Sequence, residues 1–312
     1  MMKIYKTDID NNLKEINQFE KNCWINLVSP KESEMNELTK LINVDKDYLI
    51  QFLDEEEQAR IDIEDDIKLI VLDVPTYERT KAHTLSVTMP LIIIHVNDCI
   101  ITMCTKPLNI LDDFISGKYK DFNTSKKSRF TLLLIFKAAS MYIKELKIIN
   151  EQTSKIEQAL KKSTDNAQLL KLMDLQKSLV YFTTSLKSNE SVLDRLQKTS
   201  IIPLYEEDMD ILEDVIIEHR QASEMASIYS SILSSTIDVF GTIISNNLNN
   251  VMKILASITI VVAIPTTVSS FMGMNVPLGI FQTNGNAFLI IVIISIVLSI
   301  IVAWILRKKN ML

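Results

Sequence analysis

The chain has 312 residues, of which 23% are charged and 47% hydrophobic, and its formal net charge at pH 7 is -6. Every aspartate and glutamate lies before residue 254, so the acidic excess belongs to the first four fifths of the chain. An acidic surface argues against nucleic acid as a partner and is compatible with cation binding, although it also serves simply to keep a large region soluble. We therefore expect no nucleic acid partner.

The first 120 residues have the patterns of an α/β domain. Apolar alternation predicts strands, and three- to four-residue periodicity predicts helices between them. The predicted elements are a strand at 23–27, helices at 32–42 and 45–53, a strand pair within 61–74, and a hairpin formed by 84–96 and 99–103. One mixed sheet with helices on its faces is the simplest assembly of these elements.

This region has no signature of an enzyme. The cysteines, Cys23, Cys99 and Cys104, are odd in number and lack Cys-x-x-Cys spacing, so we expect reduced core thiols. The three histidines are scattered, and no P-loop or other nucleotide signature is present. The first residues contain no apolar segment of a signal peptide, so we expect no cleaved leader. We expect no enzymatic activity, no organic cofactor and no nucleotide ligand.

Residues 121–205 read as an antiparallel helical hairpin. No glycine or proline interrupts residues 125–197, and apolar residues recur there at three- and four-residue steps. The polar residues at 163–165 are the predicted turn between the two helices. Pro203 then separates this hairpin from the helix that follows.

A very long helix is predicted after Pro203. It begins at Glu206, and no proline follows before Pro265, so one helix can continue to Phe271 and span about 100 Å at 1.5 Å per residue. We call its polar part, residues 206–253, the stalk. An apolar stripe on the stalk either packs within the chain or joins identical helices around a symmetry axis; it consists of Leu212, Val215, Ile216, Ala222, Ala226, Tyr229, Leu233, Ile237, Phe240, Ile244 and Leu248.

Residues 254–306 contain no charged side chain, which is enough for two membrane crossings of about 20 residues each. We expect a first span at 254–272, an outer loop at 273–286, a second span at 287–306 and a basic tail at 307–312. Lys253 precedes the first span, and Arg307, Lys308 and Lys309 follow the second. The positive-inside bias therefore predicts a multi-pass protein of the cell membrane with both termini in the cytoplasm.

One face of the long helix stays small or polar while the rest of the first span is Ile, Leu and Val. In helical steps it consists of Asp238, Thr242, Ser245, Asn249, Met252, Ala256, Thr259, Ala263, Thr266 and Ser270. We expect this polar face to line an aqueous conduit and the second span to face lipid. The alternative is that the hydroxyls bond back to carbonyls of their own helix.

Met252 and the neighbouring Leu255 lie one turn inside the membrane. A ring of such bulky apolar groups closes a narrow pore by excluding water, and ordinary helix packing is the equal alternative.

Gly273-Met274-Asn275 stands at the outer end of the first of two C-terminal spans. At this point the chain resembles the CorA family of magnesium channels, whose signature is Gly-Met-Asn in this place. The resemblance extends back through residues 249–255 and also includes the strand at 23–27, the segment at 53–57 and the basic tail.

This resemblance implies a funnel-shaped homopentamer, with an α/β cytoplasmic domain and long stalk helices that continue into a two-helix transmembrane region. Gly273, Met274 and Asn275 would form the selectivity filter, holding hydrated Mg²⁺ through its waters, because Mg²⁺ gives up its water reluctantly. The loop at 273–286 has no carboxylate, unlike that of some family members.

The resemblance also implies regulation by cytoplasmic Mg²⁺ bound between subunits. It places an acidic ligand at Asp214, with Glu218 one turn further along the stalk. The partner position is Gln51, which is not an acid, so Asp54 or Glu55 is the expected substitute. The alternative is a solvated acidic surface.

The expected function is influx of Mg²⁺, with Co²⁺ or Ni²⁺ as further ions, driven by membrane potential and gated by cytoplasmic Mg²⁺. One alternative is a zinc or cobalt transporter on the same scaffold, against which Met274 argues because zinc-carrying relatives tend to have Ile there. The other is a membrane-anchored scaffold without a conduit, which leaves the polar face unexplained.

Overall fold

The computed structural model describes residues 2–55, 57–64, 66–79, 84–96, 98–119, 122–162, 166–199, 201–274 and 286–311. The chain divides into two compact units, Met1–Ser235 and Thr236–Leu312. We call them the N-terminal unit and the C-terminal unit and describe each by itself.

The N-terminal unit is built on a mixed sheet. Its described strands are β1 (Met2–Thr7), β2 (Leu13–Ile16), β3 (Cys23–Val28), β4 (Ile61–Glu64), β5 (Ile67–Arg79), β6 (Thr84–His95) and β7 (Cys99–Cys104), in the spatial order β2-β1-β3-β7-β6-β5-β4. Strands β3 and β7 pair in parallel, and the other neighbours are antiparallel. The predicted α/β class and the single mixed sheet are confirmed.

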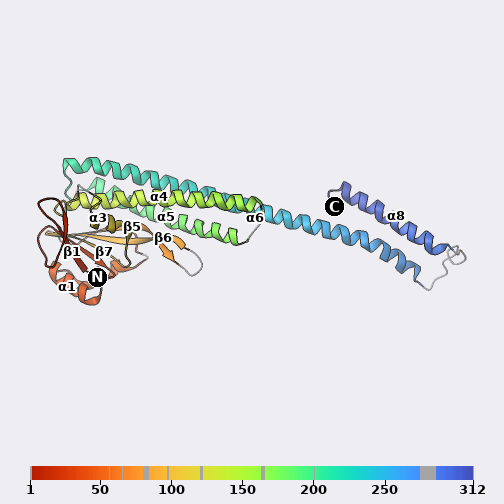
Figure 1. Cartoon of the computed structure of the whole chain (residues 1–312), viewed down its shortest axis with the longest axis horizontal. Helices are drawn as coiled ribbons and strands as arrows, with labels where there is room; N and C mark the ends of the chain where they lie inside the picture. The colour runs from red at the N-terminus through yellow and green to blue at the C-terminus, as the bar shows by residue number, and fades with distance from the viewer. Residues whose placement is uncertain are drawn as a thin grey trace. The chain divides into compact units, whose positions relative to one another are not determined.

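Alternate residues of the central strands face two separate apolar layers. One layer packs Ile25, Leu69 and Ile94 against α1 (Glu32–Ile42), α2 (Lys46–Ile50) and the short helix η1 (Gln51–Leu53). The other layer packs Trp24, Ile70 and Ile93 against α3 (Asn109–Ile115), α4 (Lys127–Lys162), α5 (Asn166–Lys198) and the start of α6 (Glu206–Met272). Figure 1 shows α1 on one side of the sheet and the long helices α4 and α5 on the other. The three cysteines are free and buried, as predicted.

Helices α4 and α5 form the predicted hairpin, and the first turns of α6 pack beside them. The apolar stripe of the stalk is buried within the chain at Leu212, Val215, Ala222, Ala226 and Leu233. Packing within the chain is therefore the correct interpretation for these positions. The proposed bundle of identical helices cannot use them as its contact surface.

Other apolar residues of α6 lie on the surface of the chain. Ile217, Ile228 and Ile232 are each more than half exposed in the N-terminal unit. They lie within about 60° of one another around the helix at 3.6 residues per turn. Within the N-terminal unit, this exposed stripe, and not the buried one, is apolar surface that α6 offers to other molecules.

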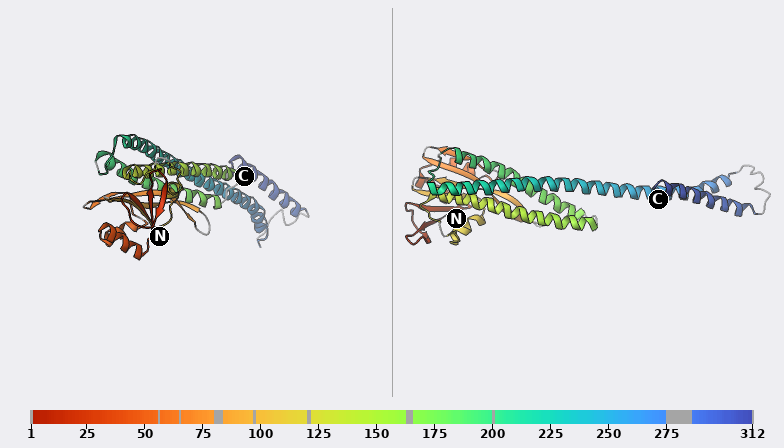
Figure 2. Two further views of the ribbon diagram at one scale, coloured as in Figure 1. Left: turned by 60° about the vertical axis from the view of Figure 1, so that its left-hand side comes forward. Right: turned by 90° about the horizontal axis from the view of Figure 1, so that it is seen from above.

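The C-terminal unit contains the remainder of α6 and the helix α8 (Ala287–Lys308). Helix α6 is continuous through Pro265, and α8 returns alongside it (Figures 1 and 2). The hydroxyl of Ser257 donates a 2.8 Å hydrogen bond to the carbonyl oxygen of Met311 and ties the chain end to α6. The predicted single helix from Glu206 to Phe271 is observed and ends one residue later.

Candidate ion-conducting face

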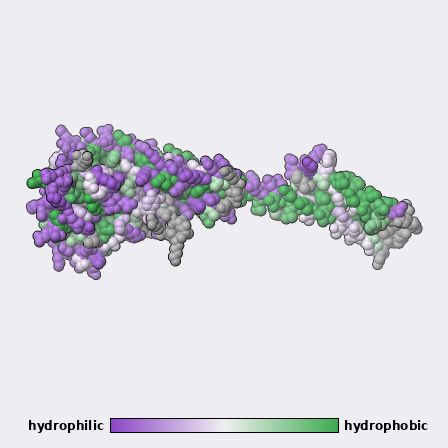
Figure 3. Space-filling view, in the orientation of Figure 1, coloured by the Kyte–Doolittle hydropathy of each residue, from purple (hydrophilic) through white to green (hydrophobic). Residues whose placement is uncertain are grey.

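Among the described residues, two helices are long and apolar enough to cross a membrane, namely α6 in its second half and α8. Only 6% of the apolar window of α6 and 11% of that of α8 are buried within the chain, so neither is the core helix of a soluble protein. Figure 3 shows hydrophobic residues gathered over these segments, whereas hydrophilic residues dominate the N-terminal unit. Surfaces of this size need lipid or further protein to cover them.

One side of α6 packs against α8. It is marked by the buried Ser257 and by the half-buried Val261, Ile264, Val268 and Met272, which follow one another at three- and four-residue steps. Facing them on α8 are Ser295, which is buried, and the half-buried Ser299 and Ala303, spaced by four residues each. Small residues at this spacing let two membrane helices approach closely.

The predicted polar face lies on the opposite side of α6. At 3.6 residues per turn, Thr259, Ala263, Thr266 and Ser270 point about 180° away from the α8 side. All four are exposed within the chain. Three of them, Thr259, Ala263 and Thr266, line a shallow groove on the surface of α6. Helix α8 therefore leaves this face open to whatever surrounds the chain.

The hydroxyls of this face bond back to their own helix. Thr242, Thr259 and Thr266 donate to the carbonyl oxygens four residues earlier, at 3.0, 2.8 and 3.2 Å. The predicted alternative, in which the hydroxyls bond to carbonyls of their own helix, is thus observed for these three threonines within the single chain. A hydroxyl that donates its proton in this way keeps its oxygen lone pairs as acceptors, which are the groups that the waters of a hydrated cation need.

The N-terminal part of the predicted face is also uncovered. Asp238, Thr242, Ser245 and Asn249 are exposed, and Asn249 and Met252 line a shallow groove together with Asn246, Asn250, Lys253, Ala256 and Met311. The predicted gate residues, Met252 and Leu255, are 55% and 57% exposed. Packing within the chain therefore does not account for these two side chains.

Gly273 closes the last turn of α6. Its N–H donates to the carbonyl oxygens of Ser269 and Ser270 at 3.0 and 3.2 Å. The backbone of Gly273 is not left-handed, and an added Cβ would meet these two oxygens only at ordinary contact distances of 3.5 and 3.6 Å. A left-handed helix cap is therefore not the reason for this glycine, and the single chain does not require it. Met274 is 53% exposed, and Asn275 lies outside the described residues.

The candidate regulatory acids lie in the N-terminal unit in different settings. Asp214 is exposed on α6, whereas Glu218 is half-buried and accepts a 2.9 Å hydrogen bond from the hydroxyl of Ser140 on α4. Asp54 and Glu55 follow η1, and Glu55 pairs with Lys106 at 2.8 Å. Within one chain, the described residues bring no three acidic, histidine or cysteine side chains together as a metal site. A Mg²⁺ ion at Asp214 would need ligands from water or from a second copy.

His219 is next to Glu218 but is not available as a charged group. Its ring is buried, and burial lowers its pKa to about 4, so the ring is neutral at pH 7. Its Nε2 has no hydrogen-bond partner among the described residues. At pH 7 His219 therefore adds no charge to this part of the stalk, which carries Glu218 and the neighbouring Arg220.

Known proteins with similar sequences and structures share this architecture. The family model described as "CorA-like Mg2+ transporter protein" matches residues 19–308. The chain belongs to this family. Among individual proteins, it is 26% identical over 291 residues to the cobalt/magnesium transport protein CorA of Methanocaldococcus jannaschii, covering 92% of this chain and 90% of the relative.

Solved structures support the fold of this CorA family member over its whole length. The complete structure of the CorA magnesium transporter from Methanocaldococcus jannaschii superposes with a TM-score of 0.84 at 24% identity, covering 100% of this chain and 99% of the other. The full-length CmaX protein gives a TM-score of 0.71 at 15% identity, with 99% and 97% covered. The architecture of both units is thus that of the family.

The residues that join α6 to α8 were not predicted. No role was expected for Ser257, Ser295 or Ser299. The signal was present, because Ser295, Ser299 and Ala303 recur at four-residue steps in an otherwise Ile- and Val-rich helix. This family member uses them for packing, whereas the threonines of α6 face outward.

Proposed function

We propose that this protein is a channel for divalent cations that passes Mg²⁺, and with it Co²⁺ or Ni²⁺, into the cell. It acts as a homopentamer in the cell membrane with both termini in the cytoplasm, and it is not an enzyme. The observation that carries this proposal is the polar face of α6. It is exposed in the single chain and lies opposite the side that α8 covers.

A ring of α6 helices gives this face a use. If copies surround an axis with the polar face inward, Thr259, Thr266 and Ser270 line a water-filled path and α8 lies outside against lipid. At the outer end of the path, Gly273 and Asn275 offer carbonyl and amide oxygens to the hydrated ion. These are neutral dipoles, which hold the waters of Mg²⁺ without stripping them and allow the ion to leave.

The membrane potential is a sufficient driving force. Two charges moving inward gain about 4.6 kcal/mol per 100 mV of inside-negative potential. The carboxylates of the chain all lie before residue 254, so an ion that leaves the path enters an acidic region. Cytoplasmic Mg²⁺ bound at Asp214, with Asp54 or Glu55 of a neighbouring copy, closes the path when Mg²⁺ is plentiful, and the exposed Met252 and Leu255 form its narrow apolar part.

Cysteine accessibility tests the arrangement of α6. We would compare Thr266→Cys on the polar face with Val268→Cys on the α8 side, both at nearly the same depth and both in a background without the three native cysteines. A membrane-impermeant thiol reagent should modify Thr266→Cys and block Mg²⁺ uptake, and should leave Val268→Cys unmodified. Equal protection of both positions would argue for a scaffold without a conduit.

A further inference from the structure

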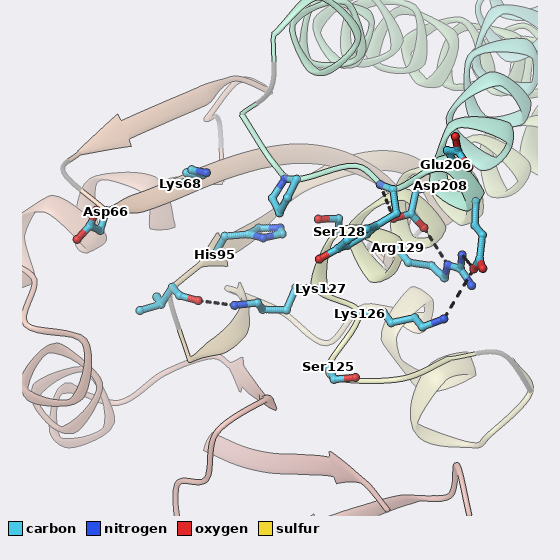
Figure 4. A pocket seen from close by; sticks show the side chains of 14 residues that line it. Asp66, Lys68, His95, Ser125, Lys126, Lys127, Ser128, Arg129, Glu206 and Asp208 are labelled. Atoms are coloured by element: carbon cyan, nitrogen blue, oxygen red, sulfur yellow. Dashed lines mark hydrogen bonds and ion pairs between the residues drawn. The ribbon is translucent and has the colours of Figure 1, made fainter. Parts of the chain in front are cut away.

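The N-terminal unit contains a cavity of about 800 Å³ that the proposed transport function does not use. It is lined by the start of β5, the end of β6, the first turn of α4 and the first turn of α6 (Figure 4). None of the candidate conduction or Mg²⁺-binding residues lines it, and all of its lining residues belong to the N-terminal unit. Its size is that of a pocket for a small molecule.

On one wall of the cavity, two of the three carboxylates, Glu207 and Asp208, are paired with cations of the chain, and the third is Glu206. The guanidinium of Arg129 donates to Asp208 through Nε at 2.9 Å and to Glu207 through a terminal nitrogen at 2.7 Å. The Asp208 side chain is only 3% exposed, and Glu207 also lies 3.9 Å from Lys126. These carboxylates are therefore occupied by cations of the chain and do not repel an anion strongly.

The facing wall carries two lysines. Lys68 and Lys127 are both half-buried, and the ammonium group of Lys127 donates to the carbonyl oxygen of Val96 at 2.9 Å. Burial is the main cause that lowers the pKa of Lys127, and the charge of Lys68 lowers it further, although Asp98 acts in the opposite direction. Asp98 itself pairs with Lys21 at 3.3 Å. The two ammonium groups on this wall repel each other, and an anion bound between them would relieve that repulsion.

His95 lies on this wall and reports the same positive field. Burial, followed by the charges of Lys127 and Lys68, lowers its pKa to about 3, and its Nε2 is 2.7 Å from the hydroxyl oxygen of Thr131. The ring is thus neutral at pH 7. In Figure 4, Lys68, His95 and Lys127 lie on one side of the cavity, with Asp66 at the outer edge of that side and Glu206 on the opposite side.

The backbone adds to the positive potential. Helix α4 has 36 residues and begins at Lys127, so its first-turn N–H groups lie at the cavity. The helix dipole places partial positive charge at this end. A phosphate group suits such a site because it carries more than one negative charge and several acceptor oxygens.

We propose that this cavity binds a small, soluble phosphate-bearing anion between Lys68 and Lys127 at the N-terminus of α4. The anion is soluble, and not a lipid headgroup, because no part of the apolar segment 254–306 lines the cavity. Phosphate is preferred to a monocarboxylate because two ammonium groups and a helix terminus face the same space.

Calorimetric titration of pyrophosphate into the full-length protein in detergent tests this proposal, in Mg²⁺-free buffer at constant ionic strength. We expect one pyrophosphate bound per chain. Lys68→Gln and Lys127→Gln should each weaken binding by about tenfold or more, because each removes a charge-assisted contact. Lys187→Gln, at an exposed position of α5, is the matched control and should bind as the wild type does.

Two results would overturn the proposal. One is the absence of binding by the wild type at millimolar pyrophosphate. The other is equal binding by the wild type, Lys68→Gln and Lys187→Gln, which would indicate a general surface charge effect. Lys127 also bonds Val96, so Lys68→Gln is the deciding variant, and its thermal midpoint must match that of the wild type in the absence of pyrophosphate.

Discussion

Replacing Arg129 by methionine should destabilise the N-terminal unit through the carboxylate that it leaves behind. Arg129 on α4 meets Asp208 in the first turn of α6, and the Asp208 side chain is 3% exposed. Methionine keeps most of the apolar stem of arginine and removes only the charged head. The change therefore isolates a buried anion without opening a large cavity.

The size of the effect follows from the burial of the pair. A buried charge that loses its partner costs about 3–5 kcal/mol. The backbone N–H of Tyr205 still donates to Asp208 at 3.3 Å, which favours the lower end of that range. The second contact of Arg129, to Glu207, adds little because the Glu207 side chain is 74% exposed. We expect a loss of about 3 kcal/mol, which lowers the thermal midpoint of a domain of this size by about 6–12 °C.

Scanning calorimetry of the full-length protein in detergent, at one scan rate and pH 7.5, measures this midpoint. The matched control is Lys198→Met, which breaks an exposed pair with Asp194 whose side chains are 71% and 58% exposed. That change should cost no more than about 0.5 kcal/mol. The double variant Arg129→Met with Asp208→Leu should recover most of the loss, since it removes the stranded charge. An Arg129→Met midpoint within about 2 °C of the wild type would refute the reasoning.

Three further predictions concern single side chains. The folded-state pKa of His219 is about 4, below its ordinary value of 6.5, so the wild type should lose up to about 3 kcal/mol of folding stability as pH falls from 6.5 to 4. The thermal midpoint of His219→Leu should fall less over this range, because the variant lacks the contribution of the histidine. Parallel curves of midpoint against pH for the two proteins would contradict this. Burial raises the pKa of Asp73 from 3.8 to about 6, so the folded state loses stability as pH rises from about 3.8 to 6, and the loss is complete above pH 6. Asp73→Asn should therefore raise the midpoint at pH 7.5 and have a smaller effect at pH 4.5, and a lower midpoint at both values would count against it. Asp214→Ala should abolish inhibition of uptake by internal Mg²⁺, whereas the exposed Asp210→Ala, one turn earlier, should not; unaltered inhibition in the first variant would remove Asp214 from the regulatory site.

Local sequence patterns predicted the long helices well. The hairpin α4–α5 and the continuous α6 follow from the lack of glycine and proline over long periodic segments, and the structure places their ends within a few residues of the predicted ones. The hairpin β6–β7 and the pair β4–β5 follow from alternation of β-branched residues around polar turns. Such elements need only local information.

Elements whose residues lack a pattern of their own were not predicted. Strands β1 and β2 mix Lys and Glu with apolar residues, because β2 is an edge strand with two exposed central residues. Helix α3 is only seven residues long and is fixed by Leu111 and Phe114, which pack into the layer formed by the long helices. Tertiary contacts decide these segments.

The candidate site likewise has one part that local sequence patterns predict and another that depends on tertiary packing. The polar face of α6 is a periodic signal within one helix, so the sequence revealed it, and its place opposite α8 could be found only from the packing of Ser257, Val261 and Val268. The Arg129–Asp208 pair and the lysine-lined cavity join residues about 60 to 80 positions apart, so no local sequence pattern predicts them. Ligands of Asp214 from another copy lie beyond any single chain.

Uptake of Mg²⁺ into proteoliposomes under an inside-negative potential, comparing the wild type with Asn275→Ala, tests the central claim most directly. The account predicts uptake by the wild type that rises with the potential and falls about tenfold or more in Asn275→Ala, the equivalent of at least about 1.4 kcal/mol lost at the mouth of the path. Potential-driven uptake that is unchanged in Asn275→Ala would contradict the assigned filter, and no uptake by a folded wild type would contradict the channel itself.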